Sequence, residues 1–186
     1  MPTVILRPDA IQSSTGFNIS GQGLQEAISD NGAATTAIQN NVTANLTCTF
    51  GNNSAYTGGT INNLVVSVTG GSTGRGTPGA TSVLHAANES VLNETSMTFA
   101  GGTTTQTSST ITEDAGGSAL TPTIVDGMFL VFTPNTTGMF IAEIFVTVDY
   151  TAGSSGYEND VMGVAVANIE KIMGVSSANI EKIIGV

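Results

Sequence analysis

The chain has 186 residues, a formal net charge of -10 at pH 7 and a pI near 4.1. With only four Lys and Arg residues it lacks the basic surface that binds phosphate backbones, which excludes nucleic acid as the expected partner. Thr, at 28 residues, and Gly, at 23, favour strands and turns, and a hydrophobic fraction of 40% predicts one folded domain with a short extension.

Residues 3–7 are predicted to form a first strand that Pro8 ends, because proline lacks the amide hydrogen that continues a β-ladder. The N-terminus lacks the basic stretch and apolar run of a secretory signal, so we expect no export signal. A short helix is predicted next, because Leu24, Ala27 and Ile28 recur at helical spacing and a turn sequence follows them.

Short apolar stretches then recur between Gly-, Asn- and Pro-containing separators, which is typical of an antiparallel β-sandwich. The predicted strands are 46–50, 61–69, 82–86, 90–99, 103–112, 128–133 and 140–150. In the last of them Ile144, Val146, Val148 and Tyr150 alternate with Phe145, Thr147 and Asp149, so the first set should face the core. No apolar run approaches the ~20 residues that span a bilayer, and we expect no membrane partner.

Two segments differ in composition from the predicted strands and are expected to connect parts of the chain. The Gly-rich stretch 70–79 is predicted to be a surface loop, either a hairpin connection or a contact made through Arg75. Residues 152–160 have the composition of a linker. The predicted organisation is therefore a β-sandwich over 1–151, a linker over 152–160 and a C-terminal arm over 161–186.

The arm repeats an 11-residue unit, since Asn-Ile-Glu-Lys-Ile-x-Gly-Val occurs at 168–175 and again at 179–186. We expect one helical turn in each Ala-Asn-Ile-Glu-Lys-Ile segment, capped by Gly and followed by an extended Gly-Val, with a longer amphipathic helix as the alternative. A soluble chain would not leave its apolar side chains bare, so they should pack on the sandwich of the same chain, on symmetry-related copies or on a larger assembly. The predicted interface residues are Ile169, Ile172, Met173, Ile180, Ile183 and Ile184.

Residues that carry chemistry are few. Cys48 alternates with Thr next to Leu46 and Phe50, which favours a small buried thiol over a nucleophile. His85 shares its strand face with Val83 and is interpreted as a half-buried structural histidine. With one His and one Cys, a zinc site and a catalytic triad are not expected, and neither is a cofactor.

Carboxylates are the remaining candidates for a site. Asp126, Glu143 and Asp149 could lie near one another, and Glu89 and Glu94 flank a strand. A Ca²⁺ site formed by such carboxylates is one minor alternative. A polysaccharide hydrolase that uses Asp126 and Glu143 as its acid pair is another. No calcium-loop spacing is present, so no metal is expected. A shallow lectin-like contact through Tyr56 or Tyr157 is a further alternative.

Three segments together resemble a jelly-roll module that is common in virion proteins of tailed bacteriophages. They are residues 3–8, residues 24–31 with Thr35 and Thr36, and the closing segments 120–130 and 144–150, so that the resemblance spans roughly residues 3 to 150. The tandem Asn-Ile-x-Lys-Ile-x-Gly-Val units are similar to segments of fibre and head-associated phage proteins. The family's role is structural or adhesive, so the resemblance implies no catalytic residue.

From these patterns we expect a non-enzymatic virion protein, assembled in the host cytoplasm as a capsid decoration or cement protein. Its partners would be other virion subunits and copies of itself, with a trimer favoured. The alternative is a head or tail fibre subunit whose sandwich loops bind a host-surface glycan.

Overall fold

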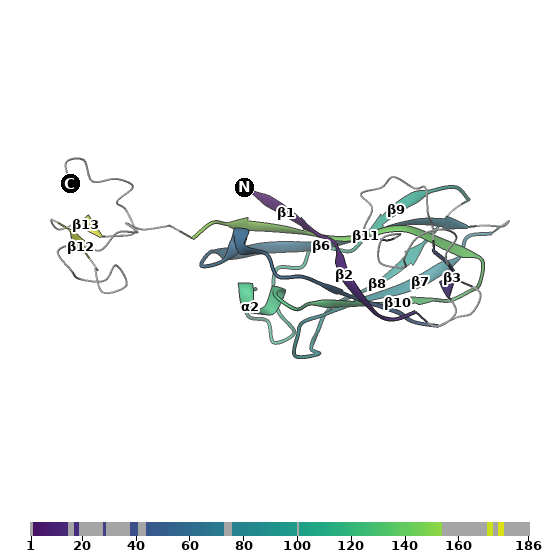
Figure 1. Ribbon diagram of the computed structural model, residues 1–186, viewed down its shortest axis with the longest axis horizontal. Helices are drawn as coiled ribbons and strands as arrows, with labels where there is room; N and C mark the ends of the chain where they lie inside the picture. The colour runs from purple at the N-terminus through teal and green to yellow at the C-terminus, as the bar shows by residue number, and fades with distance from the viewer. Residues whose placement is uncertain are drawn as a thin grey trace.

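The computed structural model describes residues 2–14, 17–18, 28, 38–40, 44–72, 76–99, 101–153, 171–172 and 175–176. Within this part of the chain two antiparallel sheets lie face to face and enclose one hydrophobic core (Figure 1). The all-β jelly-roll sandwich predicted from the sequence is confirmed.

The first sheet has six strands in the order β3-β4-β11-β6-β9, with β1 also paired to β11. Its strands are β1 (Thr3–Leu6), β3 (Phe17–Asn18), β4 (Ile38–Asn40), β6 (Thr60–Ser72), β9 (Thr104–Thr107) and β11 (Met139–Thr151). The 13-residue strand β11 pairs with β6 from Met139 to Thr151 on one side and with β1 and β4 on the other. It is therefore the central strand of this sheet.

The second sheet has five strands in the order β2-β5-β10-β7-β8. Its strands are β2 (Pro8–Ser13), β5 (Leu46–Phe50), β7 (Gly79–His85), β8 (Val91–Thr98) and β10 (Phe129–Pro134). Strand β10 lies at the centre, between β5 and β7, and β2 and β8 form the edges.

The core follows the alternation read from the sequence. Ile144, Val146 and Val148 are fully buried, and Tyr150 is partly buried against the same cluster, which confirms the predicted inner face of the last strand. In the opposite sheet, every second residue of β10 and β5 is buried in the same way. Full burial of each aliphatic or aromatic side chain contributes about 1.5–3 kcal/mol, so this double layer is the main source of stability.

The N-terminal segment changes sheets at Arg7. The prediction that Pro8 ends the first strand is correct, but the chain resumes at once as β2 in the other sheet, which was not predicted. Pro8 opposes Phe50 at the edge of that sheet, where a residue without an amide hydrogen is tolerated.

The stretch 70–79 is not one loop. Gly70, Gly71 and Ser72 continue β6, and β7 begins at Gly79, so only the residues between them connect the two strands. The loop prediction is wrong because these glycines do not mark a turn: the backbone here passes too close to its neighbours for a side chain. A Cβ on Gly71 would collide with the Gly102 carbonyl oxygen and lie 2.7 Å from Cζ of Phe140. Arg75 lies outside the described residues.

Helical structure is sparse in the described residues. The helix predicted around Leu24 to Ile28 lies outside them except for Ile28, which is helical and fully buried. Two unpredicted short turns are present, the 3-10 helix η1 (Ser54–Tyr56) and the helix α2 (Pro122–Val125). The latter starts where Thr121 Oγ1 accepts from the Ile124 N–H and proline occupies the first turn. None of the helices in the described residues has the length and apolar character needed to cross a membrane.

The arm is described at two places only, β12 (Lys171–Ile172) and β13 (Val175–Ser176), which pair antiparallel. The predicted helical turn is wrong at Lys171–Ile172, and the predicted extended conformation is confirmed at Val175. The β-branched Ile172 and Val175 oppose each other, a pairing that favours a strand over a helix. The rest of the arm, and the linker beyond residue 153, lie outside the described residues.

Candidate functional site

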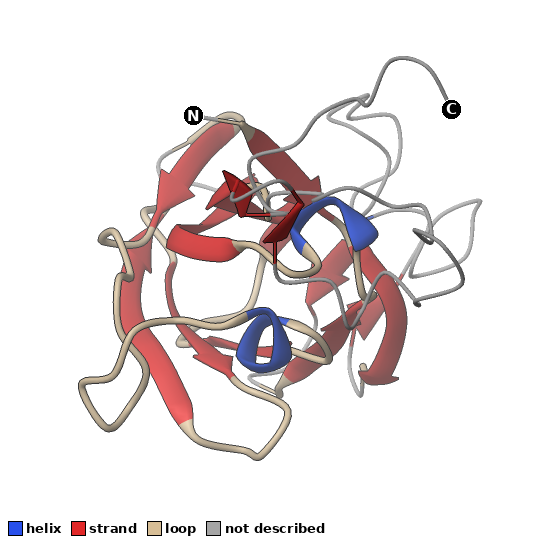
Figure 2. Cartoon of the chain, turned by 90° about the vertical axis from the view of Figure 1, so that its left-hand side faces the viewer, coloured by secondary structure: helices blue, strands red, loops and turns tan. Residues whose placement is uncertain are grey.

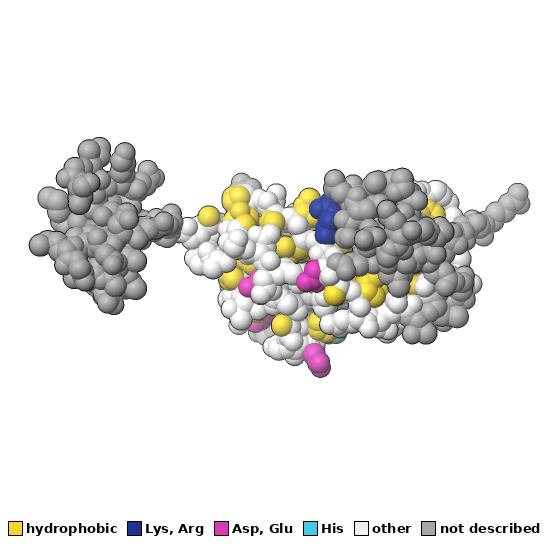
Figure 3. Space-filling view, viewed as in Figure 1, with side chains coloured by type: hydrophobic (Ala, Val, Ile, Leu, Met, Phe, Trp, Pro, Cys, Tyr) yellow, Lys and Arg dark blue, Asp and Glu magenta, His cyan; other side chains and the backbone are white. Residues whose placement is uncertain are grey.

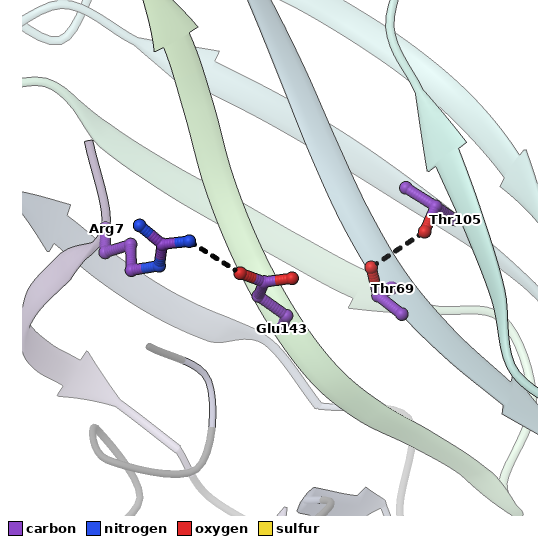
Figure 4. A network of polar contacts seen from close by, with 4 residues as sticks. All are labelled: Arg7, Thr69, Thr105 and Glu143. Carbon is purple, nitrogen blue, oxygen red and sulfur yellow. Dashed lines mark hydrogen bonds and ion pairs between the residues drawn. The ribbon is translucent and has the colours of Figure 1, made fainter. Parts of the chain in front are cut away.

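The predicted acid pair of a hydrolase does not form. Glu143 is buried, and its Oε1 lies 3.1 Å from Nη2 of Arg7 in a salt bridge (Figure 4). Glu143 follows a register shift in β11, and Arg7 stands where the chain crosses between sheets. The ion pair therefore fastens the crossing segment to the central strand, which is a structural role.

The other two carboxylates are also held by neighbours. Asp126 Oδ1 accepts a hydrogen bond of 2.9 Å from the hydroxyl of Tyr56, and Asp149 Oδ2 accepts one of 3.1 Å from Asn63. Within the described residues, no three His, Cys, Asp or Glu side chains gather as metal ligands would. Tyr56 is itself fully buried, so the predicted lectin-like contact through it is wrong, and Tyr157 lies outside the described residues.

Cys48 is fully buried between the sheets, together with Leu46 and Phe50 on the inner face of β5, as the sequence predicts. Burial raises the pKa of the thiol from 9.0 to about 12, with a further rise from the negative charge of Asp9. A thiol with this pKa is a poor nucleophile, because the thiolate is the reactive form.

The raised pKa predicts a loss of stability at alkaline pH. Because the folded protein holds the thiol proton more tightly than the unfolded chain, the contribution is complete below pH 9 and declines as the pH rises toward about 12. Between pH 9 and 10 the free energy of unfolding should fall more steeply with pH in the wild type than in Cys48→Ala. The slopes of the two proteins should differ by an amount that approaches about 1.4 kcal/mol per pH unit. Urea unfolding at several pH values measures both slopes, and equal slopes would contradict the assignment.

His85 occupies a structural position on the outer face of the five-stranded sheet. Its ring stacks on Phe129 with centroids 4.6 Å apart and an interplanar angle of 1°. Its Nδ1 lies 3.1 Å from the carbonyl oxygen of Glu89. Both contacts support the half-buried structural histidine that the sequence predicts.

The outer face around this stack carries several partly exposed apolar side chains that the strand register aligns. One row across the sheet is Ala10, Thr49, Phe129, His85 and Val91, and the next is Ser13, Thr47, Val131, Val83 and Glu94. We call Val83, His85, Val91, Phe129 and Val131 the outer strip. Val91 is 44% exposed, and the other four are half-buried. The alternation of 81–85 and 129–133 was visible in the sequence, but the alignment of the strands was not.

A second structural feature of the sandwich is the end of β11, from which the chain continues toward the linker and the arm. At the end of β11 the backbone of Thr151 and Gly153 lies directly against that of Gly58 and Gly59, so that a Cβ on either Gly59 or Gly153 would collide with a carbonyl oxygen. The Tyr150 N–H also donates to the Pro2 carbonyl oxygen at 3.1 Å. Figure 2 looks onto this end of the sandwich, where the short helical turns are drawn in blue.

The predicted interface residues Ile169, Met173, Ile180, Ile183 and Ile184 lie outside the described residues, and Ile172 is described only as part of β12. On the face of the sandwich in Figure 3, Lys or Arg side chains (dark blue) are visible at one place. Hydrophobic side chains (yellow) are scattered among other side chains and backbone (white).

Comparison with known proteins identifies no family, since no family model and no curated protein match the chain. Among solved structures, the C-terminal CBM6 of LamC, a laminarinase from Zobellia galactanivorans, is 18% identical over 79% of this chain and 98% of that chain, with a TM-score of 0.44. A carbohydrate-binding module of Cellvibrio mixtus lichenase 5A, in complex with cellotriose, is 13% identical over 80% and 97%, with a TM-score of 0.45. At these values the likeness carries no argument about ligand or activity.

Proposed function

We propose that this protein is a non-enzymatic structural protein of a tailed-phage virion, a capsid decoration or cement protein that its C-terminal arm anchors to neighbouring subunits. The supporting observation is the way the arm joins the body. The chain runs from β11, the central strand with partners on both sides, into the Gly58–Gly59 contact and then into the linker.

The connection between β11 and the arm is suited to bear a mechanical force on the arm. A force along the arm would act first on a strand whose ladder with β6 extends over its whole length, so many hydrogen bonds would share the load. The candidate chemical groups meanwhile have structural partners: Glu143 binds Arg7, Asp126 binds Tyr56, and the Cys48 thiol is buried. These contacts favour attachment over catalysis as the function.

The alternative, a fibre subunit that binds a host glycan, receives less support from the described residues. Sugar binding by stacking needs an aromatic ring with a free face. On the outer strip, one face of Phe129 is already covered by His85, and Tyr56 is buried in the core. A glycan array with the full chain tests this alternative, because a decoration protein should bind no sugar.

Removal of residues 161–186 tests the proposal. We expect the shortened chain to keep the far-ultraviolet circular dichroism spectrum and unfolding midpoint of the wild type, because none of the described core residues belongs to the arm. Its self-association, measured by sedimentation velocity, and its incorporation into particles should be lost.

A chain shortened only by residues 176–186 retains one copy of the repeat and should associate more weakly than the wild type, because avidity falls with the number of contacts. Unchanged assembly of the chain without residues 161–186 would refute the proposed role of the arm. Quantitative protein analysis of purified particles separates decoration, with many copies, from a fibre, with few.

A further inference from the structure

We propose that β9 of one copy pairs with β9 of a second copy, so that the six-stranded sheets of two copies join edge to edge about a two-fold axis. This inference rests on the proposed function, because it identifies the contact between copies that the arms hold next to one another. Among the described strands β9 pairs only with β6, so β9 forms an edge of its sheet.

The backbone of β9 presents hydrogen-bonding groups at this edge. The N–H of Ser108 donates to the carbonyl oxygen of Val66 at 2.9 Å, so Ser108 faces β6. Backbone groups alternate from side to side along an antiparallel strand. Gln106 therefore also faces β6, whereas Thr105 and Thr107 direct their N–H and C=O groups away from it. This outward row is the template for a further strand.

The side chains of β9 are compatible with pairing. Those of Thr105 and Thr107 are exposed, and Thr105 Oγ1 lies 2.9 Å from Thr69 Oγ1 of β6 (Figure 4). Residues 95–112 contain no charged side chain, although the chain has a net charge of -10. Proteins protect edge strands from pairing with charges, prolines or bulges. Strand β9, whose pairing with β6 runs without a register shift, carries none of these.

The occupant is a second copy of β9 because the other described edges are less suited. Strand β2 contains Pro8 and Asp9, and its pairing with β5 has register shifts, while β8 carries the exposed Glu94. Strand β1 ends beside Arg7, and β3 is only Phe17–Asn18. Each arm repeat places a Glu and a Lys in its Asn-Ile-Glu-Lys-Ile segment, so it would bring charges to an uncharged edge. A strand cannot pair with itself in one chain, so the contact joins two copies.

The symmetry of the contact fixes its register. A two-fold axis at Gln106 places this residue opposite Gln106 of the second copy, and Thr105 opposite Thr107. Each Thr105 then exchanges both backbone hydrogen bonds with Thr107 of the second copy, which pairs the outward groups of both strands. Gln106 forms a non-hydrogen-bonded pair, with Cα atoms about 4.5 Å apart. Because β9 is short, the contact is small and becomes effective once the arms hold the copies side by side.

Cysteine cross-linking in the full-length protein tests the pairing and its register. Under mild oxidation Gln106→Cys should form dimers about tenfold faster than Ser96→Cys, an exposed control on β8, because the spacing of the pair suits a disulfide. Thr105→Cys and Thr107→Cys should each cross-link slowly alone and rapidly when mixed. The native Cys48 is buried and does not compete.

Two further variants block the edge and leave the bonds to β6 in place. Thr105→Pro removes an N–H that faces away from β6, so the circular dichroism spectrum should be unchanged. Introduced into the Gln106→Cys protein, it should slow cross-linking to the rate of Ser96→Cys. Gln106→Lys places like charges opposite each other, and it should have the same effect on the mixture of Thr105→Cys and Thr107→Cys. If Thr105→Pro unfolds the chain, Gln106→Lys decides.

The outcomes distinguish this pairing from the proposed function. If the protein associates but Gln106→Cys cross-links no faster than Ser96→Cys, or if Thr105→Cys alone cross-links as fast as the mixture, self-pairing of β9 is refuted and the proposed function stands. If the chain without residues 161–186 cross-links through Gln106→Cys as fast as the full chain, the pairing is supported and the anchoring role of the arm fails. A full-length chain that neither associates nor cross-links overturns both.

Discussion

Gly71→Val should destabilise the sandwich by several kcal/mol, a large share of the about 5–15 kcal/mol by which domains are stable. Gly71 lies in β6, where a Cβ would collide with the Gly102 carbonyl oxygen and approach Cζ of Phe140 to 2.7 Å. The oxygen belongs to the backbone, so relief requires the strand or the neighbouring segment to move. Inserting extra methylenes into a packed core typically costs about 1–3 kcal/mol, and the cost should be at the upper end or above it where the obstructing atom is backbone.

Gly101→Ala is the matched control for Gly71→Val. No atom lies within 4 Å of a Cβ built on Gly101, and its φ is not positive, so alanine should change the free energy of unfolding by less than about 0.5 kcal/mol. Urea unfolding followed by circular dichroism measures both variants. A Gly71 variant as stable as the Gly101 variant would show that β6 does not continue through this position.

Phe132→Ala should lower the free energy of unfolding by about 3–5 kcal/mol. Phe132 is fully buried on the central strand of the five-stranded sheet, and its ring packs against Phe99 with centroids 6.3 Å apart. Its removal creates a cavity at the middle of the core and also removes the edge-to-face contact, which adds about 0.5–1.5 kcal/mol.

Phe129→Ala removes the same side chain from the opposite face of the same strand. Phe129 is half-buried on the outer strip, so its loss should cost about 1 kcal/mol, well below the cost at Phe132. Chemical denaturation of the two variants gives the comparison directly. Equal costs at the two positions would contradict the assignment of inner and outer faces, and with it the outer strip.

The position of the outer strip explains why its side chains contribute less to stability than those on the opposite face of the same strand. Side chains on the inner face of β10 form the core, whereas those on the outer face contribute little to it. Substitutions of Val83, Val91 and Val131 by threonine should therefore lower the free energy of unfolding less than substitutions of the buried residues of β10. The same reasoning applies to the arm, which supplies no residue of the described core.

The sequence determined the strands of the body well because alternation is a local property. A buried side chain at every second position, as in residues 46–50 and 144–148, identifies both the strand and its inner face without knowledge of its neighbours. The buried Cys48 followed from the same alternation. The absence of Lys from the body and the tandem repeat of the arm were likewise plain from the sequence alone.

Only the tertiary structure decided which strands lie side by side, because pairing depends on contacts between residues far apart in the chain. It placed Glu143 against Arg7 instead of Asp126, turned Gly70 and Gly71 from a loop into close-packed strand, and moved the chain to the second sheet at Pro8. It also aligned Val83, Val131 and Glu94 into one row. Strand register sets these neighbours, and the residues of a single strand do not specify its register.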